Sequence, residues 1–196
     1  MSVDQQRMID TAVSFFLGGE RCRPGCGFRN YPVHELAAPV IVCYAIAVEI
    51  ALKLLILKKE GVKISFEKIQ THDLKKLFND LSDENKSNMQ YFNELFIDFE
   101  IRNIEEDQEG FFIDSGMIIT EKSAKIYQPF VDWRYPHEKD FLTADPDKLR
   151  RAFIVCHREI RRTSPNLKSA FERDWGDFDP DWIWNEIELQ EAGSNP

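Results

Sequence analysis

The stretch 39–61 (PVIVCYAIAVEIALKLLILKKEG) constrains this chain more than any other segment. Between Val40 and Leu57 only Glu49 and Lys53 are charged, so a helix here would carry apolar side chains nearly all the way round. Such a helix must be buried. The two charges lie four residues apart with the acid first, the order that pairs them on one helical stripe. The sequence therefore predicts a core helix with one polar seam.

The same stretch bears on where the protein resides. Its apolar run is interrupted by two charges and ends at Lys58–Lys59, which argues against a membrane-spanning segment. The N-terminus has no basic region followed by a small-residue cleavage site, so no signal peptide is expected. We expect a cytoplasmic protein without membrane contact, and 196 residues suit one domain with an appendage.

The N-terminal region predicts a short helix and a long loop. Ser2 and Gln5 form a capping box, and apolar residues then recur at helical spacing, which predicts a helix over about 4–17. Gly18–Gly19 should end this helix. Residues 19–34 contain several glycines and prolines without periodicity, so we expect a loop there.

Three later helices are predicted by their starting signals, which are Thr71, Ser82 and Asp145–Pro146. Each carries one apolar stripe at a spacing of three and four residues. The stripes are Leu74, Leu77, Phe78 and Leu81; Met89, Phe92, Leu95, Phe96 and Phe99; and Leu149, Ala152, Phe153, Cys156 and Ile160.

The sum is an all-α domain over residues 1–163 with an acidic, aromatic extension over 164–196. We expect a bundle of four to five helices. A small β-hairpin is predicted over 111–119, where two apolar triplets flank Asp-Ser-Gly. A last short helix starting at Asp179–Pro180 should carry Trp182 and Trp184.

The four cysteines suit a reducing compartment. Cys43 and Cys156 lie in apolar helical patterns, where a thiol behaves as a small hydrophobe. Cys22 and Cys26 with His34 could supply three zinc ligands, but a fourth ligand is missing. We therefore expect no metal and no cofactor.

The charge distribution is uneven along the chain. A net charge of −9 argues against a general nucleic-acid coat and against DNA-specific binding. Residues 148–162 nevertheless carry six basic side chains against a single acid, and residues 172–191 carry eight acids against a single arginine. These opposed charges suggest that the C-terminal segment lies across the basic helix and competes with polyanions.

On a helical wheel the basic residues of 148–162 fall into two groups. Arg150, His157 and Arg161 share one flank of the apolar stripe, and Arg151, Arg158 and Arg162 lie opposite them. Because Arg150 and His157 lie two turns apart, they can share a ligand more readily than Arg151 and His157 can. A solvated basic face is the simpler alternative.

Three segments together resemble the HEPN superfamily. They are Ala-Val-Glu-Ile-Ala-Leu-Lys at 47–53, Thr-His-Asp-Leu at 71–74 and Trp-Arg-Tyr-Pro at 133–136, and the resemblance spans roughly residues 36–160. It implies a helical bundle that commonly dimerises and is associated with nucleotides or RNA. Many members are metal-independent endoribonucleases, and others are non-catalytic partners of nucleotidyltransferases.

The resemblance assigns roles to particular positions. Glu49, Asp73 and Tyr135 would form a structural latch that orders the bundle. Candidate ligand-binding residues are Lys53, His72 and Arg134, to which the basic helix adds Arg161. Capping of a helix is the simpler role for His72 and Asp73.

The nuclease motif of the family is an arginine followed by a histidine after about four to six residues. Such a pair can cleave RNA without metal, because imidazole moves the proton and guanidinium holds the phosphate. The candidate catalytic residues are His157 with Arg150 or Arg151, and Arg29 to His34 also fits the spacing. Only two residues separate Arg134 from His137, which departs from that spacing.

These observations favour a non-catalytic, homodimeric module associated with nucleotides or RNA, and the resemblance places it in a prokaryotic defence or stress system. Two alternatives stay open. The first is a metal-independent, toxin-like endoribonuclease. The second is a dimeric scaffold that binds a protein partner through the C-terminal segment.

Overall fold

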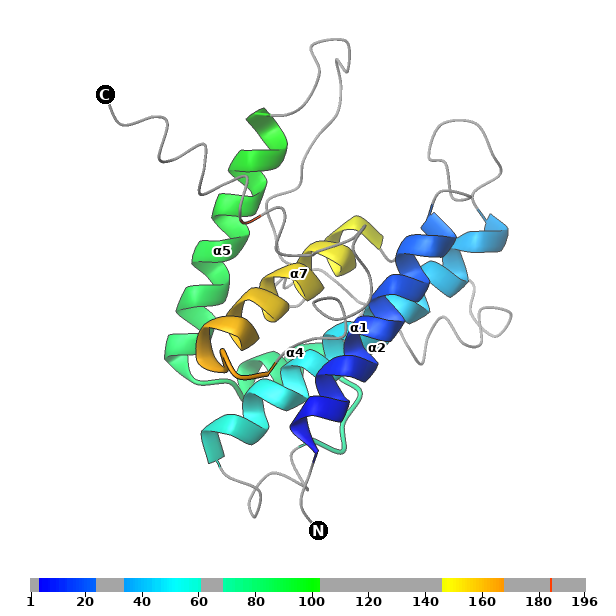
Figure 1. Ribbon diagram of the computed structural model, residues 1–196. Coiled ribbons are helices and arrows are strands. Elements are labelled where there is room, and N and C mark those ends of the chain that lie inside the picture. The colour runs from blue at the N-terminus through cyan, green and yellow to red at the C-terminus, as the bar shows by residue number, and fades with distance from the viewer. Residues whose placement is uncertain (1–3, 24–33, 61–68, 103–145, 168–183, 185–196) are drawn as a thin grey trace.

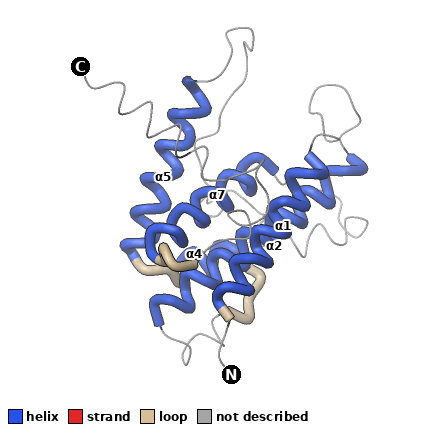
Figure 2. The backbone as a smooth tube through the Cα atoms, in the orientation of Figure 1, coloured by secondary structure: helices blue, strands red, loops and turns tan. Residues whose placement is uncertain are grey.

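The computed structural model describes residues 4–23, 34–60, 69–102, 146–167 and 184, and the elements among these residues are all helices (Figures 1 and 2). They are α1 (Gln5–Cys22), α2 (His34–Glu60), α4 (Leu74–Asn79), α5 (Asp83–Arg102) and α7 (Pro146–Thr163). No strand occurs among these residues, which confirms the all-α prediction. The hairpin expected over 111–119 lies outside them.

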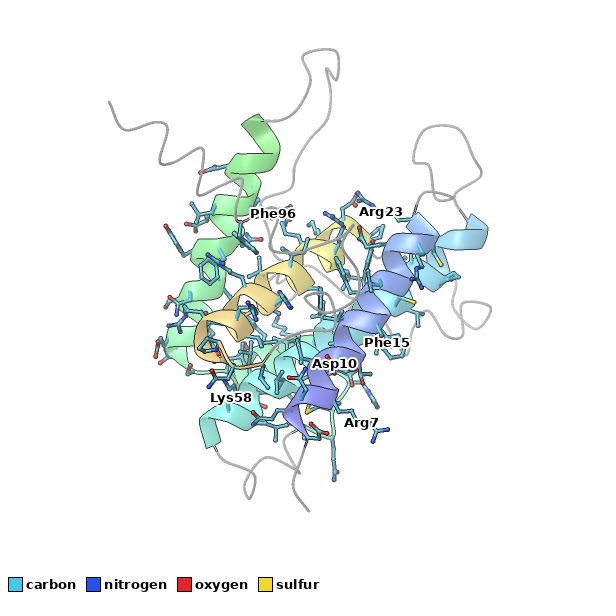
Figure 3. The ribbon with its side chains drawn as sticks, in the orientation of Figure 1. Arg7, Asp10, Phe15, Arg23, Lys58 and Phe96 are labelled. Carbon is cyan, nitrogen blue, oxygen red and sulfur yellow. The ribbon has the colours of Figure 1, made fainter. Side chains whose placement is uncertain are left out.

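Helix α7 lies in the middle of the bundle. It packs against α2 on one side and α5 on the other, α1 lies along α2, and α4 contacts α2 as well (Figure 1). Lys58 Nζ on α2 donates to the carbonyl oxygen of Thr163 at the end of α7, at 2.6 Å (Figure 3). Both faces of α7 are therefore covered.

Helix α2 is the buried helix that its apolar sequence predicts. Its side chains are almost fully buried at Val40, Ile41, Tyr44, Ala45, Ala47, Val48, Ala51, Leu52 and Leu54 to Leu57. Within the described residues, Ala38–Lys58 is the one segment long and apolar enough to cross a membrane, and 72% of its apolar window is buried inside the protein. Core helices commonly meet that criterion.

The predicted end of the first helix is wrong. Helix α1 begins after Asp4, whose carboxylate caps it by accepting from the Arg7 backbone N–H, and it continues to Cys22. The reason is tertiary packing, because Gly19 lets α1 lie directly on the ring of Tyr44. A Cβ atom at Gly19 would stand only 2.6 Å from Tyr44 Cδ1.

The predicted loop over 19–34 is also too long. Its first residues belong to α1, and His34 already begins α2, five residues before the expected start at Pro39. Proline lacks an N–H, so Pro39 cannot donate to the carbonyl of residue 35. Pro39 lies on an exposed face near the start of α2, where the helix tolerates that missing bond.

The later helices follow the predicted stripes. The residues expected to form the core of α4 and α7 are buried, and so are Met89 and Phe96 of α5. Ser82 Oγ accepts from the Asn85 backbone N–H, as expected of a cap, and Pro146 is the first residue of α7. The N-cap of α4 is Asp73 rather than Thr71, whose hydroxyl instead accepts from the Asp73 N–H.

Candidate functional site

The predicted catalytic histidine lies in the protein core. His157 is 1% exposed, and the centroid of its ring lies 6.0 Å from the centroid of the Phe153 ring. Burial, and then the charges of Arg161 and Arg158, lowers the pKa of His157 to about 3. The ring is therefore neutral at pH 7, and it is screened from any ligand that stays in solvent.

Arg150 makes a polar contact inside the bundle. Arg150 Nε donates to Glu20 Oε1 at 2.8 Å, and the Tyr44 hydroxyl donates to the same carboxylate. Burial, together with Glu20, raises the pKa of Tyr44. Arg150 thus ties α7 to α1 and α2, and the other predicted partner, Arg151, is only 5% exposed.

The C-terminal end of the basic helix lines a hollow. A cavity of about 400 Å³ is lined by Phe92, Arg158, Arg161, Arg162 and Pro165. Phe92 comes from α5 and the three arginines from α7, so the packing of the two helices creates the site. Arg150 lies about 16 Å from Arg161 along the axis of the same helix and does not line the hollow.

The three arginines of this hollow are held in different ways. Arg162 donates to both oxygens of Glu159 at 2.8 Å and to Glu84 at 2.9 Å. Arg161 Nη1 donates to the Leu167 carbonyl oxygen at 3.2 Å. The Arg158 guanidinium lies 6.0 Å from the centre of the Phe92 ring. Both of these carboxylates, Glu159 and Glu84, bind Arg162.

A second polar cluster joins α2 to α4. Glu49 Oε1 accepts from Lys53 Nζ at 2.6 Å, and His72 Nδ1 lies 3.0 Å from both Glu49 oxygens. The Glu49 and Lys53 side chains are 9% and 15% exposed, whereas that of His72 is 49% exposed. The seam expected from the sequence is therefore present, with His72 across from it.

The structure shows the role of Asp73, whereas the ligand-binding roles expected in this cluster stay predictions. Asp73 caps α4, since its carboxylate accepts from the Lys76 N–H at 3.0 Å. Ligand binding by Lys53 and His72 stays a prediction. Tyr135, the third residue of the predicted latch, and Arg134, a predicted ligand-binding residue, lie outside the described residues.

No group of three or more His, Cys, Asp or Glu side chains that could hold a metal occurs in the described part of the chain. Cys22, Cys43 and Cys156 are not part of a disulfide. Cys26, the other loop cysteine considered as a zinc ligand, lies outside that part.

Sequence reasoning missed that Phe92 and Pro165 line a hollow with the arginines. Phe92 fits the apolar stripe of α5 and is partly buried there, but its place in the hollow depends on where α5 lies against α7. Charge opposition between the two C-terminal segments was the only signal available for Trp184. Its ring belongs to the main hydrophobic core.

Comparisons with protein-family models, with curated proteins and with solved structures gave no match.

Proposed function

We propose that this protein is a cytoplasmic, homodimeric, HEPN-like module that binds single-stranded RNA or nucleotides without cleaving them. The observation that carries the proposal is the hollow at the end of α7, where Arg158, Arg161 and Arg162 surround a space of about 400 Å³ beside Phe92. The HEPN-like part of the proposal rests on the sequence resemblance, which implies a helical bundle, and the described elements are helices.

The chemistry of this hollow suits a nucleotide. A guanidinium group has five N–H donors in a planar fork and binds phosphate oxygens well. Aromatic rings such as that of Phe92 stack on exposed bases, which single-stranded RNA offers and duplexes do not. Because the whole chain carries a net charge of −9, binding should be local and sensitive to salt.

A non-catalytic role is favoured by the state of His157. A general base must reach the proton that it removes, and its pKa should lie near the working pH. His157 is 1% exposed and its pKa is lowered to about 3, so it meets neither condition in this conformation.

The endoribonuclease is the alternative, and a cleavage assay separates the two functions. Purified protein is incubated with total RNA in EDTA, alongside the His157→Ala variant. We expect intact RNA with both proteins. Cleavage that disappears in the variant would establish the nuclease instead.

The binding proposal is tested by titrating a fluorescent single-stranded RNA with the wild type and with Arg158→Ala and Arg161→Ala. Each variant should weaken binding and reduce the slope of log affinity against log salt by about 0.7. Arg7→Ala is the matched control, because Arg7 is exposed on α1 (Figure 3). Equal affinities for all four proteins would contradict this site.

A further inference from the structure

Trp184 is held between α5 and α7, next to the candidate ligand site. It is 2% exposed, and its ring centroid lies 5.5 Å from that of Phe92 and 6.3 Å from that of Phe96, each at 60° between planes (Figure 3 labels Phe96). Tilted pairs at such distances are favourable aromatic contacts. The C-terminal segment is therefore attached to the bundle at this residue.

Trp184 and the hollow share two residues. The Arg158 guanidinium lies 5.6 Å from the Trp184 ring and 6.0 Å from the Phe92 ring, and both Arg158 and Phe92 line the hollow. A cation close to an aromatic face is attracted by the ring. A ligand that binds to Arg158 or Phe92 therefore contacts a side chain that already packs against Trp184.

The sequence around Trp184 is acidic. Asp181, Glu186 and Glu188 lie within four residues of it, and no basic residue does. An extended chain advances at most about 3.5 Å per residue, so connectivity keeps the backbone of these acids within about 14 Å of Trp184. Carboxylates tethered so close to a site act at effective concentrations of about millimolar.

We propose that the C-terminal segment is an intramolecular competitor for the arginine hollow. Trp184 anchors the segment through Phe92, Phe96 and Arg158, and the neighbouring carboxylates compete with phosphate groups for the arginines. This inference rests on the proposed function, because the competing ligand is the RNA. Binding of RNA then has to displace the carboxylates, which lowers the apparent affinity.

The first test removes the acids and keeps the anchor. In a triple variant, Asp181→Asn, Glu186→Gln and Glu188→Gln, affinity for a single-stranded RNA should rise by about threefold or more at low salt. The gain should shrink as salt screens the contacts. The matched control, Asp10→Asn, Glu94→Gln and Asp98→Asn, changes net charge equally on α1 and α5. An equal gain in both variants would overturn the inference.

The second test needs no RNA. Trp133, Trp175 and Trp182 are replaced by Phe, so that acrylamide quenching reports on Trp184 alone. Neutralising the three acids, or adding salt, should increase quenching because it loosens the segment. Unchanged quenching in both cases would overturn the inference. If quenching responds while no variant binds RNA, the intramolecular contact holds and the proposed function fails.

Discussion

His157 shows at the scale of one residue how burial changes a functional expectation. Its spacing from Arg150 and Arg151 fits a nuclease motif, yet the ring lies in the core at 1% exposure. A histidine kept neutral by its surroundings contributes to folding in a way that depends on pH. That dependence gives a direct measure of its environment.

Because the folded protein lowers the pKa of His157 from 6.5 to about 3, the unfolded chain binds the proton more readily between these values. The contribution of His157 to the free energy of unfolding is complete above pH 6.5. It is lost as the pH falls towards 3, by at most about 1.4 kcal/mol per pH unit. Urea unfolding of the wild type and of His157→Gln across this range isolates the effect. Equal pH dependence in the two proteins would contradict it.

Alanine substitutions at two neighbouring glycines should change the stability of the fold in opposite directions. Gly19→Ala would press its Cβ atom into the Tyr44 ring and should destabilise the fold by about 1–3 kcal/mol. Gly18→Ala places its Cβ atom 3.5 Å from Cys43 Sγ, an ordinary contact, and should stabilise α1 by about 0.5–1 kcal/mol. Thermal unfolding of both variants checks the pair, and a shift in the same direction would be inconsistent with the packing.

Between elements, Glu49 links α2 to the start of α4. Glu49→Gln removes the charge that faces Lys53 and His72, and should cost about 1–3 kcal/mol in free energy of unfolding. In the Glu49→Gln variant, a further His72→Ala substitution should lower the free energy of unfolding only a little more, because the two side chains are in contact. Asp98→Asn on the exposed face of α5 is the control and should have little effect. Fully additive losses at Glu49 and His72 would argue against the linkage.

The helices themselves could be predicted from sequence because local periodicity reports on a buried face. Leu74, Leu77 and Phe78 are an example, since all three are buried as expected. The ends of α1 and α2 could not be predicted, because they depend on contacts between helices. Gly19 and Pro39 are usually helix-ending residues, and here packing at Gly19 and exposure at Pro39 make them compatible with helix.

At the scale of the whole molecule, the central place of α7 decides which of its basic residues can act. The sequence identified the arginines and divided them into two flanks, but α2 and α5 cover both sides of the helix. Arg150 and Arg151 are therefore largely buried, whereas Arg158, Arg161 and Arg162 line the hollow. Only the arrangement of three helices distinguishes these two groups.

The most direct test of the central claim is to map where RNA contacts the protein. A single-stranded RNA carrying 4-thiouridine is cross-linked by UV light, and the modified peptides are identified by mass spectrometry. We expect cross-links at the residues that line the hollow, with fewer in Arg158→Ala; these residues are Phe92, Arg158, Arg161, Arg162 and Pro165. Cross-links confined to the Glu49–His72 cluster, or to the surface of α1, would contradict the account.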